Sequence, residues 1–110
     1  MDDKERDETR AEFGELVNMT PAELDRWLES EESRDAGRHK GGGESTGHAS
    51  GRRITRILRT KKADLTDDDY RHMRKVVGYV RRHLAQRPSG DVRDTRWRYS
   101  LMNWGHDPLS

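Results

Sequence analysis

The sequence predicts an all-α fold, a small bundle of four to five helices with a long glycine-rich loop between the second and the third. Three observations support this fold class. Apolar residues recur at spacings of three and four, capping signals precede several of these apolar stretches, and no stretch alternates with period two for long enough to form a strand. Only 29% of the residues are apolar and 39% are charged, so the core of this 110-residue chain must be small.

Residues 1–12 are predicted to form an acidic N-terminal arm ahead of a single helical domain at residues 13–110. Most of the first twelve residues are charged. Phe13, Leu16 and Val17 then form an apolar patch with the i, i+3, i+4 spacing of a helix. We therefore expect an amphipathic helix to end near Val17.

The next helix has the clearest start in the chain. Thr20 can act as its N-cap, Pro21 fits the first helical position, and Glu23 completes a capping box with Thr20. This helix is expected to end near residue 30. Its predicted buried face consists of Leu24, Trp27 and Leu28.

Residues 31–50 are predicted to form a flexible glycine-rich loop. Apolar periodicity is lost from Glu31 onward, and six glycines fall between residues 31 and 51. A structureless stretch of this length is uncommon inside a compact domain and is usually either functional or disordered. Ser50 is expected to cap the helix that follows. The residues of that helix expected to point inward are Ile54, Ile57 and Leu58.

A long helix is predicted from Thr66 to about Arg87. Three aspartates follow Thr66, and acids in the first turn of a helix complement its dipole. The apolar stripe of this helix, expected to form the core, consists of Tyr70, Met73, Val77, Val80 and Leu84. A final aromatic segment at residues 97–104 is expected to be helical, with Gly105 as its C-terminal cap. Its two tryptophans are expected in the core rather than against nucleic acid bases.

The strongest functional indication is the uneven distribution of charge. Residues 1–35 carry 13 acidic and 5 basic side chains, whereas residues 36–110 carry 8 acidic and 17 basic ones. The net charge of +1 thus combines an acidic segment with a strongly basic one. Such asymmetry is typical of proteins that bind nucleic acid or another anionic surface, or that shield such a surface with an arm of their own.

Two predicted helices present basic runs that contain no acid, at residues 52–62 and 71–87. Side by side, these helices would form a surface that releases counterions on binding DNA or RNA. Gly78, in the middle of the second run, would let a phosphate backbone or another helix approach closely. The predicted phosphate-contacting residues are Arg52, Arg53, Arg56, Arg59, Arg71, Arg74, Lys75, Arg81 and Arg82.

Glycines and hydroxyl residues before the third helix predict a second anion-binding element. Backbone N–H groups, the positive end of a helix dipole and the two arginines that follow favour a phosphate. The spacing matches neither a Walker A loop nor a dinucleotide-binding fingerprint, so a phosphate of a nucleic acid backbone is favoured over a nucleotide cofactor. An ordinary helix cap after a loop is the alternative interpretation. The residues of this predicted anion-binding loop are Gly47, His48, Ser50 and Gly51.

No residue pattern predicts catalysis, a metal site or a cofactor. The chain has no cysteine, which excludes disulfides and thiolate chemistry, and its five histidines lack metal-binding spacing. A hydrolytic pair of His48 and Glu44 is the enzymatic alternative. No apolar run reaches the roughly 18 residues of a membrane span, and the first residues lack the pattern of a signal peptide. We therefore expect no membrane association and a cytoplasmic location, at the nucleoid if the protein binds DNA.

Four stretches of the chain together resemble a known family. They are NMTPAELDRWL at residues 18–28, ESTGHASGRRI at 44–54, VVGYVRRHLAQRP at 76–88 and WRYSLMNWGHDP at 97–108. The family consists of small, mainly bacterial proteins classed as a domain of unknown function, some of whose members are labelled DNA-binding. The resemblance covers roughly residues 13–109 and leaves residues 1–12 outside. It implies the identity of the domain and agrees with a DNA-binding role, but it implies no catalytic or binding residue.

The sequence therefore predicts a non-enzymatic nucleic-acid-binding protein that holds DNA through its phosphates with weak sequence preference, with RNA as an alternative nucleic acid. Residues 1–12 are expected to compete with DNA for the basic surface. The alternative function is a protein-interaction or stress-related module. Its basic face would bind an acidic partner, or the acidic arm of a second copy in a homodimer.

Overall fold

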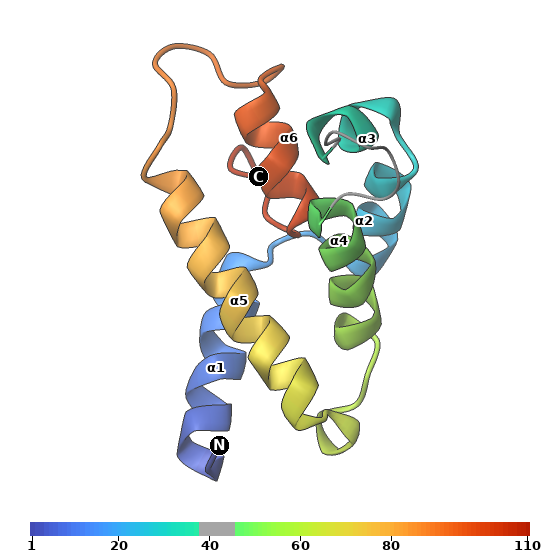
Figure 1. Cartoon of the computed structure of the whole chain (residues 1–110), viewed down its shortest axis with the longest axis vertical. Helices are drawn as coiled ribbons and strands as arrows, with labels where there is room; N and C mark the ends of the chain where they lie inside the picture. Colours follow the sequence, from blue (N-terminus) through green and yellow to red (C-terminus); the bar gives the residue numbers. More distant parts are fainter. Residues whose placement is uncertain (38–45) are drawn as a thin grey trace.

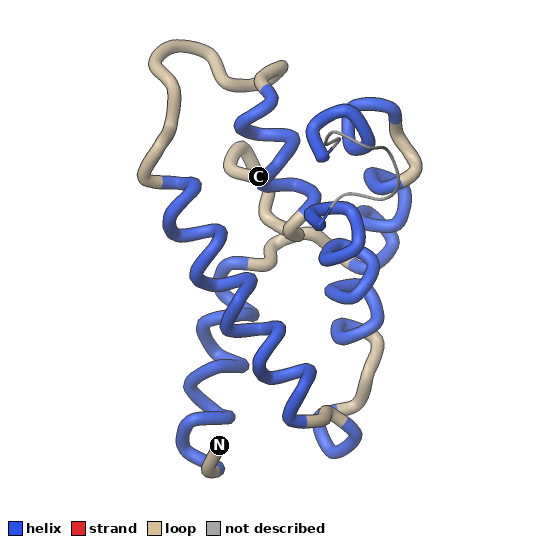
Figure 2. Tube along the Cα trace, viewed as in Figure 1, coloured by secondary structure: helices blue, strands red, loops and turns tan. Residues whose placement is uncertain are grey.

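The computed structural model describes residues 1–37 and 46–110, and these residues form helices, turns and loops without a strand. In chain order the elements are α1 (Asp3–Leu16), α2 (Pro21–Leu28), α3 (Glu31–Gly37), α4 (Thr46–Leu58), the 3₁₀ turn η1 (Lys62–Asp64), α5 (Asp67–Leu84) and α6 (Arg96–Asn103). The long helix α5 packs against α1 on one side, while α2, α3, α4 and α6 gather on the other (Figure 1, Figure 2). The predicted all-α bundle is confirmed, with more helices than the sequence indicated.

The core lies between α5 and the helices on either side of it. Four members of the predicted stripe on α5 are buried, and Leu84 packs against them at the edge. Val76, which lies outside that stripe, is also fully buried, because α5 has neighbours on two sides. Phe13, Leu24 and both tryptophans of the final aromatic segment join the same cluster.

Side-chain caps mark the starts of α1, α2, α5 and α6. The backbone N–H of Glu23 donates to Thr20 Oγ1 at 3.1 Å, and the backbone N–H of Thr20 donates to Glu23 Oε1 at 2.9 Å. The same reciprocal arrangement joins Thr66 and Asp69 at the start of α5. Both starts agree with the sequence-based prediction, because a capping box needs only residues that are close together in the chain.

The structure corrects the prediction of a loop at residues 31–50 where it describes this stretch. Residues 31–37 form α3 and residues 46–50 form the first turns of α4, so most of this stretch is helical. Its helices bury small polar residues, such as Ser33, in place of apolar ones. A Cβ added to Gly51 would lie 2.6 Å from the backbone oxygen of Asn103, so this glycine permits close helix packing. The prediction for residues 38–45 lies outside the described residues.

The predicted boundary after residue 12 falls inside α1. This helix runs from Asp3 to Leu16 without interruption and packs along α5. Thr9 and Phe13 are both buried, one on each side of the expected boundary. The acidic segment is therefore continuous with a helix of the bundle.

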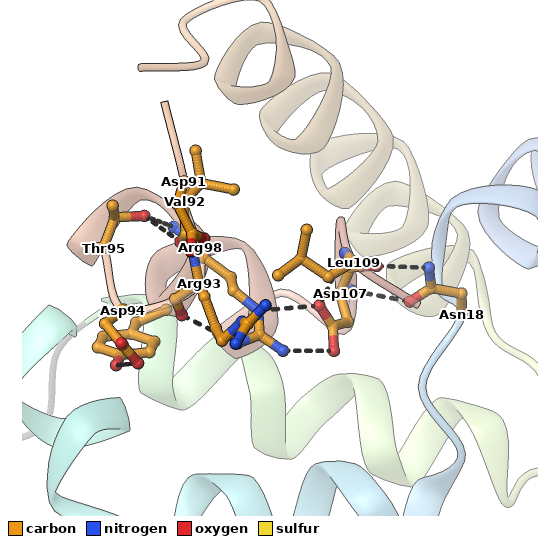
Figure 3. A network of polar contacts seen from close by, with 10 residues as sticks. Asn18, Asp91, Val92, Arg93, Asp94, Thr95, Arg98, Asp107 and Leu109 are labelled. Carbon is orange, nitrogen blue, oxygen red and sulfur yellow. Dashed lines mark hydrogen bonds and ion pairs between the residues drawn. The ribbon is translucent and has the colours of Figure 1, made fainter. Parts of the chain in front are cut away.

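A polar clasp ties the end of the chain to the connection between α1 and α2 (Figure 3). Arg98 donates from Nε and Nη2 to the carboxylate of Asp107, at 3.1 and 3.0 Å. The Asn18 side chain accepts from the Asp107 N–H and donates to its carbonyl, at 2.8 and 2.9 Å. Gly105, which has a φ of +81°, makes the turn after α6, as predicted. This clasp holds α6 in register with the rest of the bundle.

Candidate functional site

The exposed side of α5 carries basic residues on two flanks. Arg74 and Arg81 are seven residues apart and face α1, where they meet its carboxylates. Lys75 and Arg82 are also seven residues apart and face α4 and α6, where they line a pocket. The two flanks differ because residues seven apart share one side of a helix, while a step of one residue turns by about 100°.

The flank that faces α1 is neutralised by acidic residues of the same chain. Arg74 Nη2 lies 3.3 Å from Glu5 Oε2, and Arg81 Nη1 lies 3.3 Å from Glu12 Oε2. All four side chains are about half exposed, at 45% to 57%. Exposed ion pairs of this kind contribute only about 0–1 kcal/mol each, so a competing anion can displace them at little cost.

Other predicted phosphate-contacting residues also have carboxylate partners. Arg53 and Arg56 lie 3.6 and 3.8 Å from Asp69 Oδ1, at the start of α5. Hydrogen bonds from Thr66, and to a lesser extent these two arginines, hold the pKa of Asp69 below its usual range. The two remaining pairs join Arg59 to Asp25 and Arg71 to Asp68.

Lys75 and Arg82 stand apart from this pattern. Both are exposed, and neither takes part in an ion pair with any residue in the described ranges 1–37 and 46–110. They line a pocket with a volume of about 380 Å³, within the range of small-molecule sites. The other described lining residues are Ala36, Thr46, Gly47, Tyr79, Ser100, Asn103 and Trp104, none of which is acidic. The two cations therefore make the described lining of this pocket electropositive.

Gly78 lies one turn before Arg82 on α5. A Cβ added to Gly78 would meet Arg82 Nη1 at 3.0 Å, and its nearest atoms all belong to that side chain. The glycine thus makes room for the Arg82 guanidinium to lie along α5. One of the two roles predicted for Gly78 was to let another helix approach closely. No atom of another helix is among the nearest neighbours of this glycine in the described structure.

Stacked aromatic rings form one wall of the pocket. The rings of Tyr79 and Trp104 stack with their centroids 4.2 Å apart, and His83 stacks on Tyr79 at 5.2 Å. Trp104 is only 4% exposed, and no residue in the described ranges accepts a hydrogen bond from its Nε1. The indole N–H groups of the other tryptophans have acceptors, Asn103 Oδ1 for Trp27 and the carbonyl of His83 for Trp97. The Trp104 N–H therefore has no acceptor among the described residues, on a side chain that lines the pocket.

The N-terminal end of α4 closes the pocket. Thr46 and Gly47, the first two residues of this helix, both line it. A Cβ added to Gly47 would lie 3.2 Å from Trp104 Nε1, so the glycine brings the first turn of α4 up to the indole N–H. Because the N-terminus of a helix carries partial positive charge, it adds to the effect of the two cations.

The four residues of the predicted anion-binding loop, Gly47, His48, Ser50 and Gly51, lie within α4 rather than in a loop. Gly47 alone of these four lines the pocket. His48 Nε2 donates to the carbonyl of Leu28 at 2.6 Å, and Ser50 Oγ is hydrogen-bonded to His72 Nε2 at 2.9 Å. The side chains of His48 and Ser50, and the space beside Gly51, thus serve the packing of α4 against its neighbours.

His72 lies between the basic residues of α4 and those of α5. Burial, together with the nearby charges of Arg53 and Lys75, lowers the pKa of His72 to about 4. The ring is therefore neutral near pH 7 and adds no charge to the surface. Because the charges of both Arg53 and Lys75 act on this ring, Arg53 of α4 and Lys75 of α5 both lie near His72.

The described residues contain neither a membrane-spanning helix nor a cluster of metal ligands. No helix among them is both long enough and apolar enough to cross a membrane. No group of three or more histidine, aspartate or glutamate side chains within residues 1–37 and 46–110 is placed to hold a metal ion. Glu44, the expected partner of His48 in the enzymatic alternative, lies outside the described residues.

Sequence reasoning named Lys75, Arg82 and Gly47 separately, and the structure brings them together. It missed Thr46 and Ser100, and it assigned Trp104 to the core, where the ring lies, without a role for its N–H. The sequence does indicate that residues 72, 75, 79 and 82 share one side of α5 and form a polar and aromatic strip. It does not indicate which segments pack beside that strip to form the pocket.

Comparison with known proteins identifies a family but no characterised relative. The family model described as "Protein of unknown function (DUF3140)" matches residues 12–102, which is most of the chain. No curated protein matches the sequence, and no solved structure matches it either.

Proposed function

The chain belongs to this family of proteins of unknown function, DUF3140, and we propose that it binds nucleic acid, in the first instance DNA, through phosphate contacts with weak sequence preference. One observation carries the proposal. Lys75 and Arg82 are exposed on the same flank of α5 and have no ion pair with a described residue, at the mouth of a pocket whose described lining contains no acid. Unpaired cations on a rigid helix are suited to phosphates.

The basic residues of α4 and α5 support an extended ligand rather than a single ion. Arg53 and Arg56 of α4 lie close to Asp69 at the start of α5, His72 lies near both Arg53 and Lys75, and Lys75 and Arg82 line the pocket. The ion pairs of Arg53 and Arg56 are long, at 3.6 and 3.8 Å, so these arginines can turn to phosphates without losing a strong contact. A backbone with a phosphate at each nucleotide matches this row of cations.

Helix α1 has a regulatory place in this proposal. Its carboxylates at Glu5 and Glu12 occupy Arg74 and Arg81, which a bound duplex would otherwise contact. Nucleic acid and α1 therefore compete for the same two guanidinium groups. Lys75 and Arg82 would make the first contacts, because they need not break an existing ion pair.

A salt titration with a short labelled DNA duplex of arbitrary sequence tests the proposal. The affinity should fall steeply as salt rises, because bound phosphates release counterions. Lys75→Ala with Arg82→Ala should weaken binding and reduce the slope of log K against log salt by about 2. Lys61→Ala with Lys62→Ala is the matched control, since these exposed lysines carry the same charge away from the pocket. Equal slopes for the two double variants would contradict the proposed surface, and an RNA duplex in the same assay distinguishes the two nucleic acids.

The structure also favours one competing function, an interaction with an acidic helix. Glu5 and Glu12 of α1 are seven residues apart, as are the arginines they meet on α5, so an acidic helix of this spacing fits the flank. In a second copy of the chain, α1 could make these contacts across a dimer. A molar mass near twice that of the monomer, without affinity for polyanions, would favour this alternative.

A further inference from the structure

We propose that the pocket between α4, α5 and α6 binds a phosphate monoester, the group found on a free nucleotide and at a phosphorylated end of a nucleic acid strand. The inference rests on the proposed function only for the second of these two sources. It concerns the interior of the pocket, whereas the proposed function concerns the surface around its mouth.

The charges of the pocket fit a dianion. Lys75 and Arg82 supply two positive charges, and the described lining contains no carboxylate to cancel them. A phosphate monoester carries a charge of about −1.5 to −2 near pH 7, whereas an inner phosphodiester or a carboxylate carries one negative charge. Arg82 can bind two phosphate oxygens at once, and Lys75 adds a compact charge beside it.

Neutral donors complete the site at its inner end. The Trp104 indole is 96% buried, its N–H has no acceptor among the described residues, and it lies against Gly47 in the first turn of α4. This N–H can therefore donate to an oxygen atom of a molecule bound in the pocket. The N-terminus of α4 and the hydroxyl groups of Thr46 and Ser100 line the same space. Together these groups can satisfy several oxygens of one phosphate.

The position of Trp104 selects a terminal group. Because Trp104 is only 4% exposed, a phosphate must enter the pocket, rather than lie across its mouth, to accept a hydrogen bond from the indole. A phosphate inside a strand has a nucleotide on each side and cannot enter so far, whereas a monoester can. The aromatic wall does not act as a stacking platform for a base, because Trp104 and His83 cover the two sides of the Tyr79 ring.

The three indole N–H signals in a ¹⁵N–¹H correlation spectrum test this inference. Titration with adenosine 5′-monophosphate should shift the Trp104 signal. The signals of Trp27 and Trp97 should stay unchanged, because their N–H groups already have acceptors within the chain. Adenosine without the phosphate should shift none of them. Lys75→Ala with Arg82→Ala should weaken the response by about tenfold for each charge removed. Lys61→Ala with Lys62→Ala should leave it unchanged.

A second titration compares a DNA strand that has a 5′-phosphate with the same strand that has a 5′-hydroxyl. A Trp104 shift with the nucleotide alone assigns the pocket to free nucleotides, and a shift with the phosphorylated strand as well assigns it also to strand ends. An unmoved Trp104 signal in every titration would overturn the inference, as would equal shifts with adenosine. Because duplex binding in the salt titration is measured separately, DNA that binds without any Trp104 shift would refute the pocket and leave the proposed function standing.

Discussion

Removing two carboxylates from α1 tests whether this helix and nucleic acid compete for the same arginines. Glu5→Gln with Glu12→Gln keeps the length and polarity of both side chains but removes the charges that hold Arg74 and Arg81. This is a sharper perturbation than deleting residues 1–12, because a deletion would also remove buried Thr9 and half of α1.

The expected gain in affinity follows from the strength of the two ion pairs. Each joins side chains that are about half exposed, at a distance of 3.3 Å. Such pairs contribute about 0.2–1 kcal/mol each. Phosphates that bind the double variant therefore no longer have to break ion pairs that together contribute about 0.4–2 kcal/mol. Binding at low salt should therefore tighten by about 2-fold to 30-fold. The stability of the free protein should fall by no more than the same amount.

The matched control is Glu8→Gln with Glu15→Gln, on the same helix. Both glutamates are exposed, and neither has an ion pair with a residue that the structure describes, so the net charge changes equally without freeing an arginine. Fluorescence anisotropy with a labelled duplex measures affinity at several salt concentrations. The variant that frees the arginines should gain more than the control, and the difference should shrink as salt screens the ion pairs. Equal gains would refute the competition, since net charge alone would then explain both.

Two further predictions concern stability. Because the pKa of His72 is about 4 in the folded protein against 6.5 for the free side chain, the unfolded chain takes up a proton first as the pH falls. His72 should therefore remove about 2 kcal/mol of stability between pH 7 and pH 5. Urea unfolding at both pH values should show that His72→Gln lacks most of this loss, and equal losses in the two proteins would contradict the prediction. Gly51→Ala should destabilise the fold by about 1–3 kcal/mol, since its Cβ would lie 2.6 Å from Asn103 O and 2.7 Å from Leu28 Cδ2. Gly14→Ala, whose Cβ meets nothing within 4 Å, should instead stabilise α1 by up to about 1 kcal/mol, and the same sign for both alanines would contradict this reasoning.

The sequence predicted most accurately what short-range chemistry determines. The starts of α2 and α5 depend on reciprocal bonds between residues three apart, Thr20 with Glu23 and Thr66 with Asp69, which a reader can find in the sequence. The buried stripe of α5 follows from its spacing alone. Gly105 ends α6 as expected, because its positive φ suits glycine.

The loop predicted at residues 31–50 failed because its helices are held by polar contacts over long distances. Asn103 donates to the carbonyl of Ser33 at 3.0 Å across 70 residues, and its Oδ1 accepts from Trp27 across 76. A search for apolar periodicity cannot detect α3, whose buried residue is Ser33, or the first residues of α4, which bury Ser50 and Gly51. Two of the glycines that indicated flexibility, Gly47 and Gly51, instead lie close to Trp104 and Asn103, which only the structure reveals.

The sequence shows where the basic residues cluster, but it does not show which of them have a carboxylate partner in the folded protein. The run at residues 71–87 contains no acid, yet Arg74 meets Glu5, which is 69 residues away in the sequence. The sequence could not assign this partner, because it depends on how α1 and α5 pack. Several predicted phosphate-contacting residues have a carboxylate of a described residue as a partner, namely Arg53, Arg56, Arg59, Arg71, Arg74 and Arg81.

The distribution of these partners distinguishes a binding surface from internal charge matching. If the acidic segment served only to neutralise the basic helices, carboxylates should be found opposite every exposed cation of α5. They are found opposite Arg74 and Arg81, whereas Lys75 and Arg82 have none among the described residues and line a pocket where the described lining has no acid. Helix α5 thus has two arginines, Arg74 and Arg81, that are paired with carboxylates of α1, and two cations, Lys75 and Arg82, that are not. Under the proposed function, a ligand that first contacts Lys75 and Arg82 would then compete with α1 for Arg74 and Arg81, and α1 would set the affinity rather than cover the surface permanently.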